Sequence, residues 1–323
     1  MDFLKTYASK IESGLQNIGL PAAPETLYEP QRYMLSSSGK RIRPILTLMG
    51  CGLCGKPVER AIPAALAVEL IHNFTLMHDD IMDQAESRRG RQSVHIKWST
   101  ATAILAGDSM FAQAMQQLHL LADSVNFKEI HKEFLDGINR VCEGQALDME
   151  FEERADVSAA EYIEMISGKT AALISTALKM GGIAAEAADD RVEQLGIIGH
   201  SLGLAFQVQD DLLDVVADPE KFGKKKGGDI FEGKKTYLMV RTLDCCTDSE
   251  RLWLTDRLNN RPLHFDDVKK VTELYRKYEI PESSQRLIAD YYQKAENALH
   301  RFDDSEYKRD LATLITYLKK REF

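Results

Sequence analysis

Several features that would indicate other classes of protein are scarce or missing in this chain of 323 residues. Its apolar runs are shorter than the roughly 20 residues that a membrane-spanning helix needs. Acidic residues outnumber basic ones and give a net charge of −9, whereas a general nucleic-acid binder needs a basic surface. The first residues lack the basic start and apolar core of a secretory signal. We therefore expect a cytosolic globular protein with no transmembrane segment and no nucleic-acid partner.

Cysteine is also rare, with five residues in the chain. Cys51 and Cys54 form one C-x-x-C pair, but a structural zinc site needs a second pair or two histidines at ligand spacing, and none follows. The pair lies in the apolar run 46–54, so we interpret both cysteines as small buried residues. Cys142, Cys245 and Cys246 are scattered and indicate no disulfide framework.

Proline (9) and glycine (20) are few and fall mostly between long segments. Within these segments apolar residues recur at i, i+3, i+4 and i+7, which is typical of amphipathic helices. No stretch alternates with period two for long enough to indicate a sheet. The predicted helices cover residues 64–84, 100–123, 128–151, 159–180, 190–216 and 281–302. We expect an all-α fold, a single large helical bundle around a central cavity, with one domain over residues 1–323.

A D-D-x-x-D motif, Asp79, Asp80 and Asp83, ends the first of these segments. On a helix the carboxylates of Asp79 and Asp83 lie one turn apart on one face and repel each other. A divalent cation would offset this repulsion, and Mg²⁺ takes one or two protein carboxylates and completes its shell with water and phosphate oxygens. His72 lies two turns earlier on the same stripe. The alternatives are a solvated acidic helix end and, for His72, a core histidine bonded to a backbone carbonyl.

The motif recurs at the end of another apolar helix, where Gln207, Asp210, Asp211 and Asp214 share one face by the same spacing. Two independent motifs of this kind are hard to explain as surface charge. They predict two walls of carboxylates that face each other across a cavity and are bridged by several metal ions.

Basic residues are grouped beside both motifs, and these groups predict sites for two diphosphates. Ser87-Arg-Arg-Gly90 follows the first motif, and guanidinium groups suit phosphate oxygens because they donate in a planar fork. The lysine- and glycine-rich segment 222–236 follows the second and has the composition of a mobile, phosphate-covering lid. A third group is Ser38-Gly-Lys-Arg-Ile-Arg-Pro44. Ser167-Gly-Lys-Thr170 is not a nucleotide P-loop, because Ile163 stands where that motif needs glycine and the segment has a helical pattern.

Because of these motifs and their order, the sequence resembles the trans-isoprenyl diphosphate synthases (polyprenyl synthetases) from about Gly39 to Thr236. The motifs G-K-R-x-R-P, D-D-x-x-D-x(4)-R-R-G, G-K-T and F-Q-x-x-D-D-x-x-D occur in the family's order, whereas the region after Tyr237 is similar only in its helical character. The resemblance implies a prenyltransferase that condenses isopentenyl diphosphate with an allylic diphosphate (dimethylallyl, geranyl or farnesyl). It also implies several Mg²⁺ ions, bound together with the allylic diphosphate, and a homodimer.

The resemblance further implies roles for individual residues. The implied magnesium ligands are Asp79, Asp83 and Asp210, with Asp80, Asp211 and Asp214 as ligands or as partners of the ligands. The residues implied to bind the allylic diphosphate are Arg88, Lys169, Lys224 and Lys234. Those implied to bind the diphosphate of isopentenyl diphosphate are Lys40, Arg43, His72 and Arg89. Thr170 and Gln207 would direct oxygen atoms at the developing allylic cation, and Phe206 would pack on the isopentenyl group.

Product length depends on the residues about one turn before Asp79, Phe74 and Thr75, because helical side chains lean towards the N-terminus and would form a floor beneath the metals. An aromatic side chain there predicts an early stop, at C15 or C20, unless Phe74 is simply part of the core. Two alternatives to the synthase are a terpene cyclase and a non-catalytic subunit of a heteromeric prenyl synthase. A cyclase's second motif typically mixes Asn, Ser or Thr with Glu, and such subunits tend to lose one aspartate cluster, whereas both are intact here.

Overall fold

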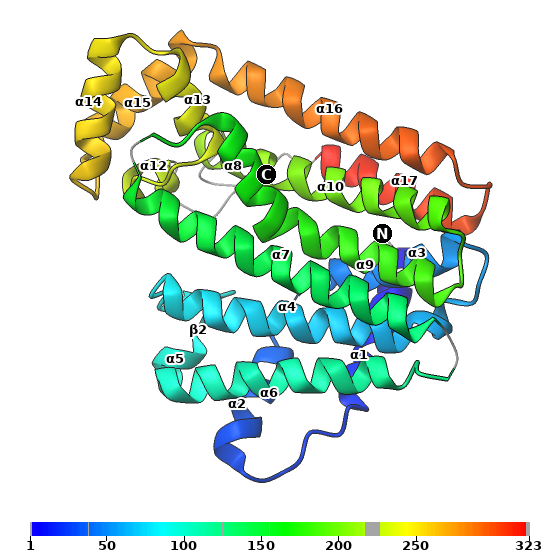
Figure 1. Ribbon diagram of the computed structural model, residues 1–323. Coiled ribbons are helices and arrows are strands. Elements are labelled where there is room, and N and C mark those ends of the chain that lie inside the picture. The colour runs from blue at the N-terminus through cyan, green and yellow to red at the C-terminus, as the bar shows by residue number, and fades with distance from the viewer. Residues whose placement is uncertain (1, 38, 124–125, 155, 217–226, 321–323) are drawn as a thin grey trace. The chain divides into compact units, whose positions relative to one another are not determined.

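The structure is a computed structural model that describes residues 2–37, 39–123, 126–154, 156–216 and 227–320 (Figure 1). Its regular elements are helices apart from one hairpin of two-residue strands, β1 (Ser87–Arg88) and β2 (Arg91–Gln92). The predicted all-α class is therefore confirmed. None of the helices in these ranges is both long enough and apolar enough to cross a lipid bilayer.

Contacts between Cα atoms divide the chain into two compact units. Unit 1 comprises Met1–Ile138, Thr176–Gly196 and Phe302–Asp310, and unit 2 comprises Asn139–Ser175, Ile197–Arg301 and Leu311–Phe323. Four helices contribute residues to both units: α7 (Phe127–Glu153), α9 (Ala172–Ala184), α10 (Asp189–Val216) and α17 (Glu306–Lys319). The single domain predicted over residues 1–323 stays a prediction.

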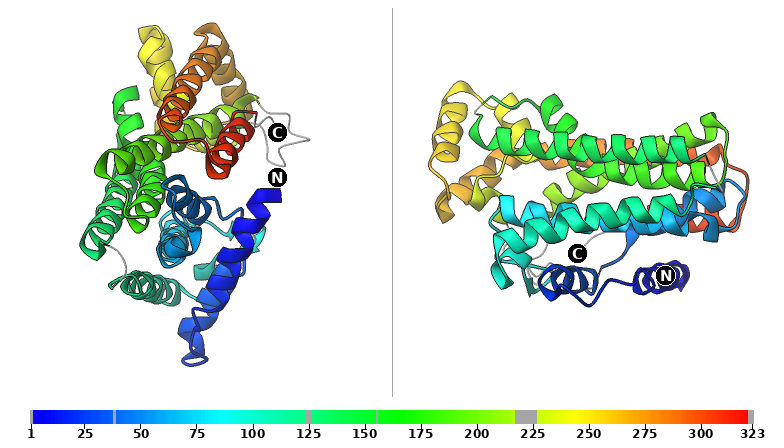
Figure 2. Two further views of the ribbon diagram at one scale, coloured as in Figure 1. Left: turned by 90° about the vertical axis from the view of Figure 1, so that its right-hand side faces the viewer. Right: turned by 60° about the horizontal axis from the view of Figure 1, so that its bottom comes forward.

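The centre of unit 1 is helix α4 (Ile62–Met82). The other helices that lie wholly in this unit are α1 (Asp2–Gln16), α2 (Glu25–Leu35), α3 (Ile42–Leu53), α5 (Val94–Lys97) and α6 (Thr100–His119), with a 3₁₀ turn at Val58–Ala61. Residues 64–71 of α4 are all buried, as expected of a helix that is apolar on every side. Helix α4 packs chiefly against α6 and α3, and Figures 1 and 2 show α4 and α6 side by side.

Close backbone contact between α3 and α9 in unit 1 depends on glycine. A Cβ atom on Gly181 would lie 2.1 Å from the carbonyl oxygen of Thr47, and one on Gly50 would lie 2.4 Å from that of Leu178. Any side chain at either position would force the two helices apart, because packed interiors leave little free space. Cys51 is buried beside this contact, as predicted, and burial raises the pKa of its thiol to about 12.

Unit 2 contains α8 (Ala159–Ile166), a π-helical turn (Ser167–Ala171), α12 (Gly228–Glu232) and α13 (Tyr237–Cys245). It also contains α14 (Asp248–Asn259), α15 (Phe265–Lys277) and α16 (Ile280–His300). Helix α13 packs against α8, α15 and α16, and its residues 237–240 are buried. Helices α14 and α15 lie together (Figure 2), joined by hydrogen bonds from Lys277 and Tyr278 to Glu250.

Five of the six predicted helices agree with α4, α6, α7, α10 and α16 to within a few residues at each end. The helix predicted over residues 159–180 is also found, as a helical run without a gap from Ala159 to Ala184, but its turn at Ser167–Ala171 is π-helical and divides the run into α8 and α9.

Candidate active site

The first aspartate motif closes α4, and its three carboxylates have different surroundings. Asp80 is 2 % exposed, whereas Asp79 is half-buried and Asp83 is exposed at the end of the helix. Arg88 donates from Nε to Oδ1 of Asp80 at 2.6 Å and from Nη2 to Oδ2 of Asp79 at 3.1 Å. Burial raises the pKa of Asp80, although the charge of Arg88 opposes the rise. The middle aspartate is therefore directed into the protein, and the outer two lie closer to solvent.

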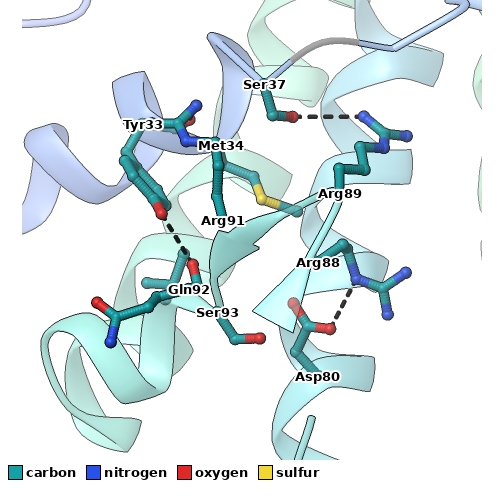
Figure 3. A pocket seen from close by; sticks show the side chains of 10 residues that line it. Tyr33, Met34, Ser37, Asp80, Arg88, Arg89, Arg91, Gln92 and Ser93 are labelled. Carbon is teal, nitrogen blue, oxygen red and sulfur yellow. Dashed lines mark hydrogen bonds and ion pairs between the residues drawn. The ribbon is translucent and has the colours of Figure 1, made fainter. Parts of the chain in front are cut away.

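The hairpin of β1 and β2 presents the two arginines of the R-R-G motif in different directions. Arg89 and Gly90 both have positive φ, 53° and 73°, and form the two-residue turn that matches the twist of a hairpin. In the pocket drawn in Figure 3, Arg88 reaches Asp80, while Arg89 donates to the hydroxyl of Ser37 at 3.3 Å. The hairpin thus separates two neighbouring guanidinium groups.

A cluster of basic side chains surrounds Arg89 in unit 1. Arg43 Nη1 lies 3.2 Å from His72 Nε2. A Cβ atom on Gly39 would lie 2.8 Å from Nη1 of Arg89, so the segment that carries the exposed Lys40 passes directly beside that guanidinium. Arg43 therefore contacts His72, and the segment of Lys40 passes beside Arg89, while the diphosphate-binding role of these four residues stays a prediction.

Electrostatics indicates that this cluster suits an anion. Burial and the nearby arginines hold the pKa of His72 well below its ordinary value, so the ring is neutral and its Nε2 accepts from Arg43. Burial lowers the pKa of Arg43 to about 10, with Glu69 opposing the change and Arg89 adding to it. Nε of Arg43 is buried without a hydrogen-bond partner in the part of the chain that the structure describes. Buried donors of this kind are normally satisfied, and anionic oxygens would satisfy this one.

Phe74 and Thr75, the predicted floor residues, lie on α4 in contact with different groups. The Phe74 ring packs edge-on against His78 at 4.7 Å between centroids and against Phe111 of α6 at 6.1 Å. A Cβ atom on Gly107 of α6 would lie 2.4 Å from His78 Nε2 and 3.2 Å from Phe74, so glycine makes room for both rings. The Thr75 hydroxyl donates to the carbonyl of His72 at 2.9 Å. The floor role of both residues stays a prediction.

The second aspartate motif, in unit 2, also turns its middle aspartate inward. Asp211 is 4 % exposed and accepts hydrogen bonds from Tyr162 Oη at 2.5 Å, the Tyr237 amide at 3.0 Å and Gln207 Nε2 at 3.1 Å. Burial raises its pKa to about 7, although these hydrogen bonds oppose the rise. Asp214 is buried and accepts from the amide of Asp229 at 3.1 Å. These bonds connect the motif to α8, α12 and α13.

The G-K-T segment forms the π-helical turn, a feature often found at functional sites. The Thr170 hydroxyl donates to Gln207 Oε1 at 3.0 Å, and Lys169 forms an ion pair with Asp148 of α7. A Cβ atom on Gly144 would lie 2.0 Å from the Lys169 amide nitrogen, and one on Gly203 would lie 2.4 Å from the Ala171 Cα atom. The missing side chains of Gly144 on α7 and Gly203 on α10 therefore let both helices pack closely against the turn that carries Lys169 and Thr170.

The two lysines of the G-K-K-T segment have different partners. Lys234 forms ion pairs with Glu232 at 2.7 Å and Asp229 at 3.4 Å. Lys235 instead donates to the carbonyl oxygens of Phe151, Glu152 and Arg154 at the C-terminal end of α7. Of the remaining predicted residues, Lys224 lies outside the described residues, while Phe206 and Asp210 are half-buried on α10.

Metal binding by these aspartates stays a prediction, and their oxygen donors fit magnesium. Among the described residues no three His, Cys, Asp or Glu side chains are gathered into a ready-made metal site. Mg²⁺ rarely uses such a cage and binds through one or two carboxylates together with water and substrate phosphates. The predicted convergence of Asp79 and Asp210 on shared ions stays a prediction.

Comparison with known proteins extends this picture. A profile described as polyprenyl synthetase matches residues 24–275. The chain belongs to the polyprenyl synthetase family. This membership confirms the predicted family and its class of enzyme, a trans-prenyltransferase.

Individual members of the polyprenyl synthetase family are similar along most of the chain. A short chain isoprenyl diphosphate synthase of Methanothermobacter thermautotrophicus is 38% identical over 322 residues, 100% of this chain and 98% of its own. A geranylgeranyl diphosphate synthase of Saccharolobus solfataricus is 42% identical over 259 residues, 79% of this chain and 78% of its own. The crystal structure of a geranylgeranyl pyrophosphate synthetase from Pyrococcus horikoshii superposes with a TM-score of 0.93 at 35% identity, covering 99% of this chain and 98% of its own.

Sequence reasoning missed several residues that hold the site. Asp148 pairs with Lys169, Tyr162 binds Asp211, and Glu69 pairs with Arg41. Asp148 and Lys169 are 21 residues apart in the chain, and Tyr162 and Asp211 are 49 residues apart, so no local sequence pattern reveals either contact. A signal for Glu69 was present, because an acidic residue in an otherwise apolar helix segment needs a buried partner.

Proposed function

We propose that this enzyme condenses isopentenyl diphosphate with an allylic diphosphate, head to tail, to give a C15–C20 trans-prenyl diphosphate and diphosphate. The observation that carries the proposal is that both aspartate motifs are complete and similarly built, each with its middle aspartate buried and bonded. The names of the relatives, short chain isoprenyl and geranylgeranyl diphosphate synthase, support the substrate class and the product range.

We propose Asp79, Asp83 and Asp210 as magnesium ligands, because each places a hard oxygen donor on the more open side of its helix. Bound Mg²⁺ would neutralise the charge of the leaving diphosphate and so make it a better leaving group. Asp80, Asp211 and Asp214 would support the ligands from behind, since their oxygens already accept hydrogen bonds from the protein.

Cationic side chains would bind the allylic diphosphate where negative charge develops in the transition state. Arg88, Lys169 and Lys234 are the described candidates, and each now pairs with carboxylates that a diphosphate would replace. Thr170 and Gln207 share a hydrogen bond, so their oxygens are held together near Lys169. These oxygens would stabilise the allylic cation without reacting with it.

The isopentenyl diphosphate would occupy the cluster of Lys40, Arg43, His72 and Arg89, with Phe206 against its hydrocarbon part. The buried Nε of Arg43 supports this assignment, because phosphate oxygens would supply the acceptor that it needs. The allylic carbon–oxygen bond would break first, and the double bond of isopentenyl diphosphate would then attack the allylic cation and form the new carbon–carbon bond. The departing diphosphate would take the proton whose loss restores a double bond, so no catalytic histidine is required.

Product length and assembly are finer parts of the proposal. We assign Phe74 to the floor of the chain-binding cavity, supported by its contacts with Phe111 and His78. Phe74→Ala is expected to lengthen the product, as measured by mass, and an unchanged length removes Phe74 from the floor.

A homodimer is supported by the exposed apolar side chains of Ile104 and Leu105 on α6, and sedimentation of the purified chain tests it. The cytosolic location stays a prediction.

The test is to incubate the purified chain with Mg²⁺, isopentenyl diphosphate and a C5, C10 or C15 allylic starter, with and without EDTA. Elongation that requires Mg²⁺ supports the proposal. Release of diphosphate with a hydrocarbon product would instead identify a terpene cyclase, and no turnover would identify a non-catalytic subunit. Mass analysis with each starter gives the preferred starter and the product length.

A further inference from the structure

Arg41 stands between Lys40 and Arg43 in the basic motif, but its side chain is held by the protein. It is 5 % exposed. Nη1 donates to Glu69 Oε1 at 2.6 Å, Nε to Glu12 Oε1 at 2.7 Å, and Nη2 to the Leu35 carbonyl at 2.5 Å. All three guanidinium nitrogens are therefore engaged by the protein, so Arg41 cannot serve as a substrate ligand in the way we propose for its neighbours.

The backbone at Arg41 is also unusual. Its φ of 48° and ψ of 33° place it in the left-handed region, immediately before α3 begins. This conformation is unfavourable for a residue with a side chain, because the Cβ atom comes too close to the following carbonyl oxygen. Such strain persists where surrounding contacts over-determine the conformation, and it often accompanies a functional constraint. Here the surrounding contacts are those of the guanidinium group.

The principal partner, Glu69, is 2 % exposed on α4, three residues before His72. Its Oε1 also accepts from Asn73 Nδ2 at 3.0 Å, which fixes the carboxylate in the helix. Burial alone would lower the pKa of Arg41, but Glu69 and Glu12 together raise it, so the guanidinium keeps its charge in spite of its burial. The charge of Glu69 also acts on Arg43 and Arg89 and keeps their pKa values from falling further.

These contacts determine where the neighbours of Arg41 lie. Gly39 passes beside Arg89, and Arg43 reaches His72, on either side of the residue that Glu69 anchors. We propose that the buried Arg41–Glu69 ion pair is the positioning element that holds Arg43 against His72 and the Gly39–Lys40 segment beside Arg89, and so sets the affinity for isopentenyl diphosphate. This inference rests on the proposed function.

If the Arg41–Glu69 pair had a purely structural role, its removal would have a different effect. Buried ion pairs often contribute little net stability, yet removing one partner is destabilising because the other charge stays buried. A structural pair would therefore lower the melting temperature and disturb both substrates alike. A positioning pair acts selectively on one diphosphate.

The experiment compares Glu69→Gln and Arg41→Lys with wild type in steady-state kinetics. For Glu69→Gln we expect KM for isopentenyl diphosphate to rise about 10- to 100-fold, the range that a misplacement of roughly 1 Å can produce. KM for the allylic substrate and kcat should stay within about twofold, and Arg41→Lys should give a smaller rise because the ammonium group keeps a positive charge beside Glu69. The matched control is Glu186→Gln, which removes an exposed ion pair to Arg60 in the same unit.

Isopentenyl diphosphate binding by calorimetry provides a readout that does not depend on turnover. If wild type binds this diphosphate and Glu69→Gln binds it 10- to 100-fold more weakly, the inference stands even if no elongation is found and the proposed reaction fails. Unchanged binding and KM in Glu69→Gln, or equal losses for both substrates, overturn the inference. Should Glu69→Gln not fold, Glu12→Gln replaces it and is expected to raise the same KM about threefold, as for a half-exposed pair; an unchanged KM there also overturns the inference.

Discussion

The two aspartate motifs have the same spacing but are held by different chemistry. In the first, a single guanidinium, that of Arg88, bonds both Asp79 and Asp80. In the second, Asp211 accepts from neutral donors: a phenol, a side-chain amide and a backbone amide. In both motifs the middle residue is buried, as is Asp214 of the second motif, and the more open Asp79, Asp83 and Asp210 are the candidates for metal binding.

This difference teaches that a repeated motif need not have a repeated environment. A charged partner compensates a carboxylate directly, whereas neutral donors only solvate it. Accordingly, burial carries the pKa of Asp211 to about 7, while Arg88 limits the rise at Asp80. We expect the first motif to respond to salt and the second to the loss of single hydrogen bonds.

The largest expected effect tests whether the two motifs are equal in catalysis. Asp79→Ala and Asp210→Ala should each lower kcat/KM for the allylic substrate by about 10³-fold or more, because each removes a charge that stabilises the transition state through a metal ion. Elongation assays measure this loss. Asp136→Ala, which removes an exposed ion pair of α7, is the control. Near-normal activity in either motif variant would show that one motif is dispensable.

The next largest expected effect concerns the stability that the neutral donors give to the second motif. Tyr162→Phe should lower the free energy of unfolding by about 1–3 kcal/mol, because the buried carboxylate of Asp211 loses a donor that nothing replaces. Urea unfolding measures the change. Tyr33→Phe, which loses an exposed hydrogen bond to the Gln92 carbonyl, should change it by less than about 0.5 kcal/mol. Equal effects of the two substitutions would contradict the role given to Tyr162.

Salt sharpens the same comparison. The effect of Arg88→Met on unfolding should shrink by roughly half between 0.05 and 1 M salt, because Arg88 is partly exposed and its ion pairs are screened. The effect of Tyr162→Phe should not change over this range. If both effects change in parallel, the contrast between charged and neutral partners is wrong.

The smallest effect is a pH dependence that differs between the units. The pKa values of His72 in unit 1 and His200 in unit 2 are both lowered, chiefly by burial, and that of His72 is lowered further by nearby arginines. Below about pH 6.5, the ordinary pKa of histidine, each of these rings takes up a proton in the unfolded chain but not in the folded one. The free energy of unfolding therefore falls as the pH drops, by at most about 1.4 kcal/mol per pH unit for each histidine. His72→Asn should reduce this slope between pH 6.5 and 5 more than His200→Asn does. The reverse order would contradict the arginine contribution.

Much of the fold follows from local sequence pattern. The apolar repeat predicts α4, α6, α7, α10 and α16 because each helix buries one face, or nearly all of itself, against its neighbours. The aspartates and arginines of the site are likewise recognisable, since their spacing already places them on single helical faces and in one short loop.

The remainder depends on contacts between distant residues. The π-helical turn at Lys169 forms where Gly144 and Gly203 leave room for its backbone, whereas the apolar pattern of residues 159–180 predicts the helix but not the π-helical turn within it. The left-handed backbone of Arg41 is stabilised by Glu69, 28 residues away. A motif shows which residue types are present, whereas the direction in which each side chain points is decided by tertiary partners.

The C-terminal end of α7 is one such partner, and it binds only the second of two adjacent lysines. The ammonium group of Lys235 lies at the C-terminal carbonyls of α7, where the helix dipole favours positive charge, while Lys234 lies among carboxylates. Removing the charge of Lys235, for example by acetylation, would therefore fray the end of α7 and loosen the start of α13. The same modification at Lys234 would instead remove its ion pairs with Asp229 and Glu232 and leave the contacts at the end of α7 in place. Two identical basic residues in consecutive positions can thus have different structural roles, one at the end of a helix and the other in a group of ion pairs.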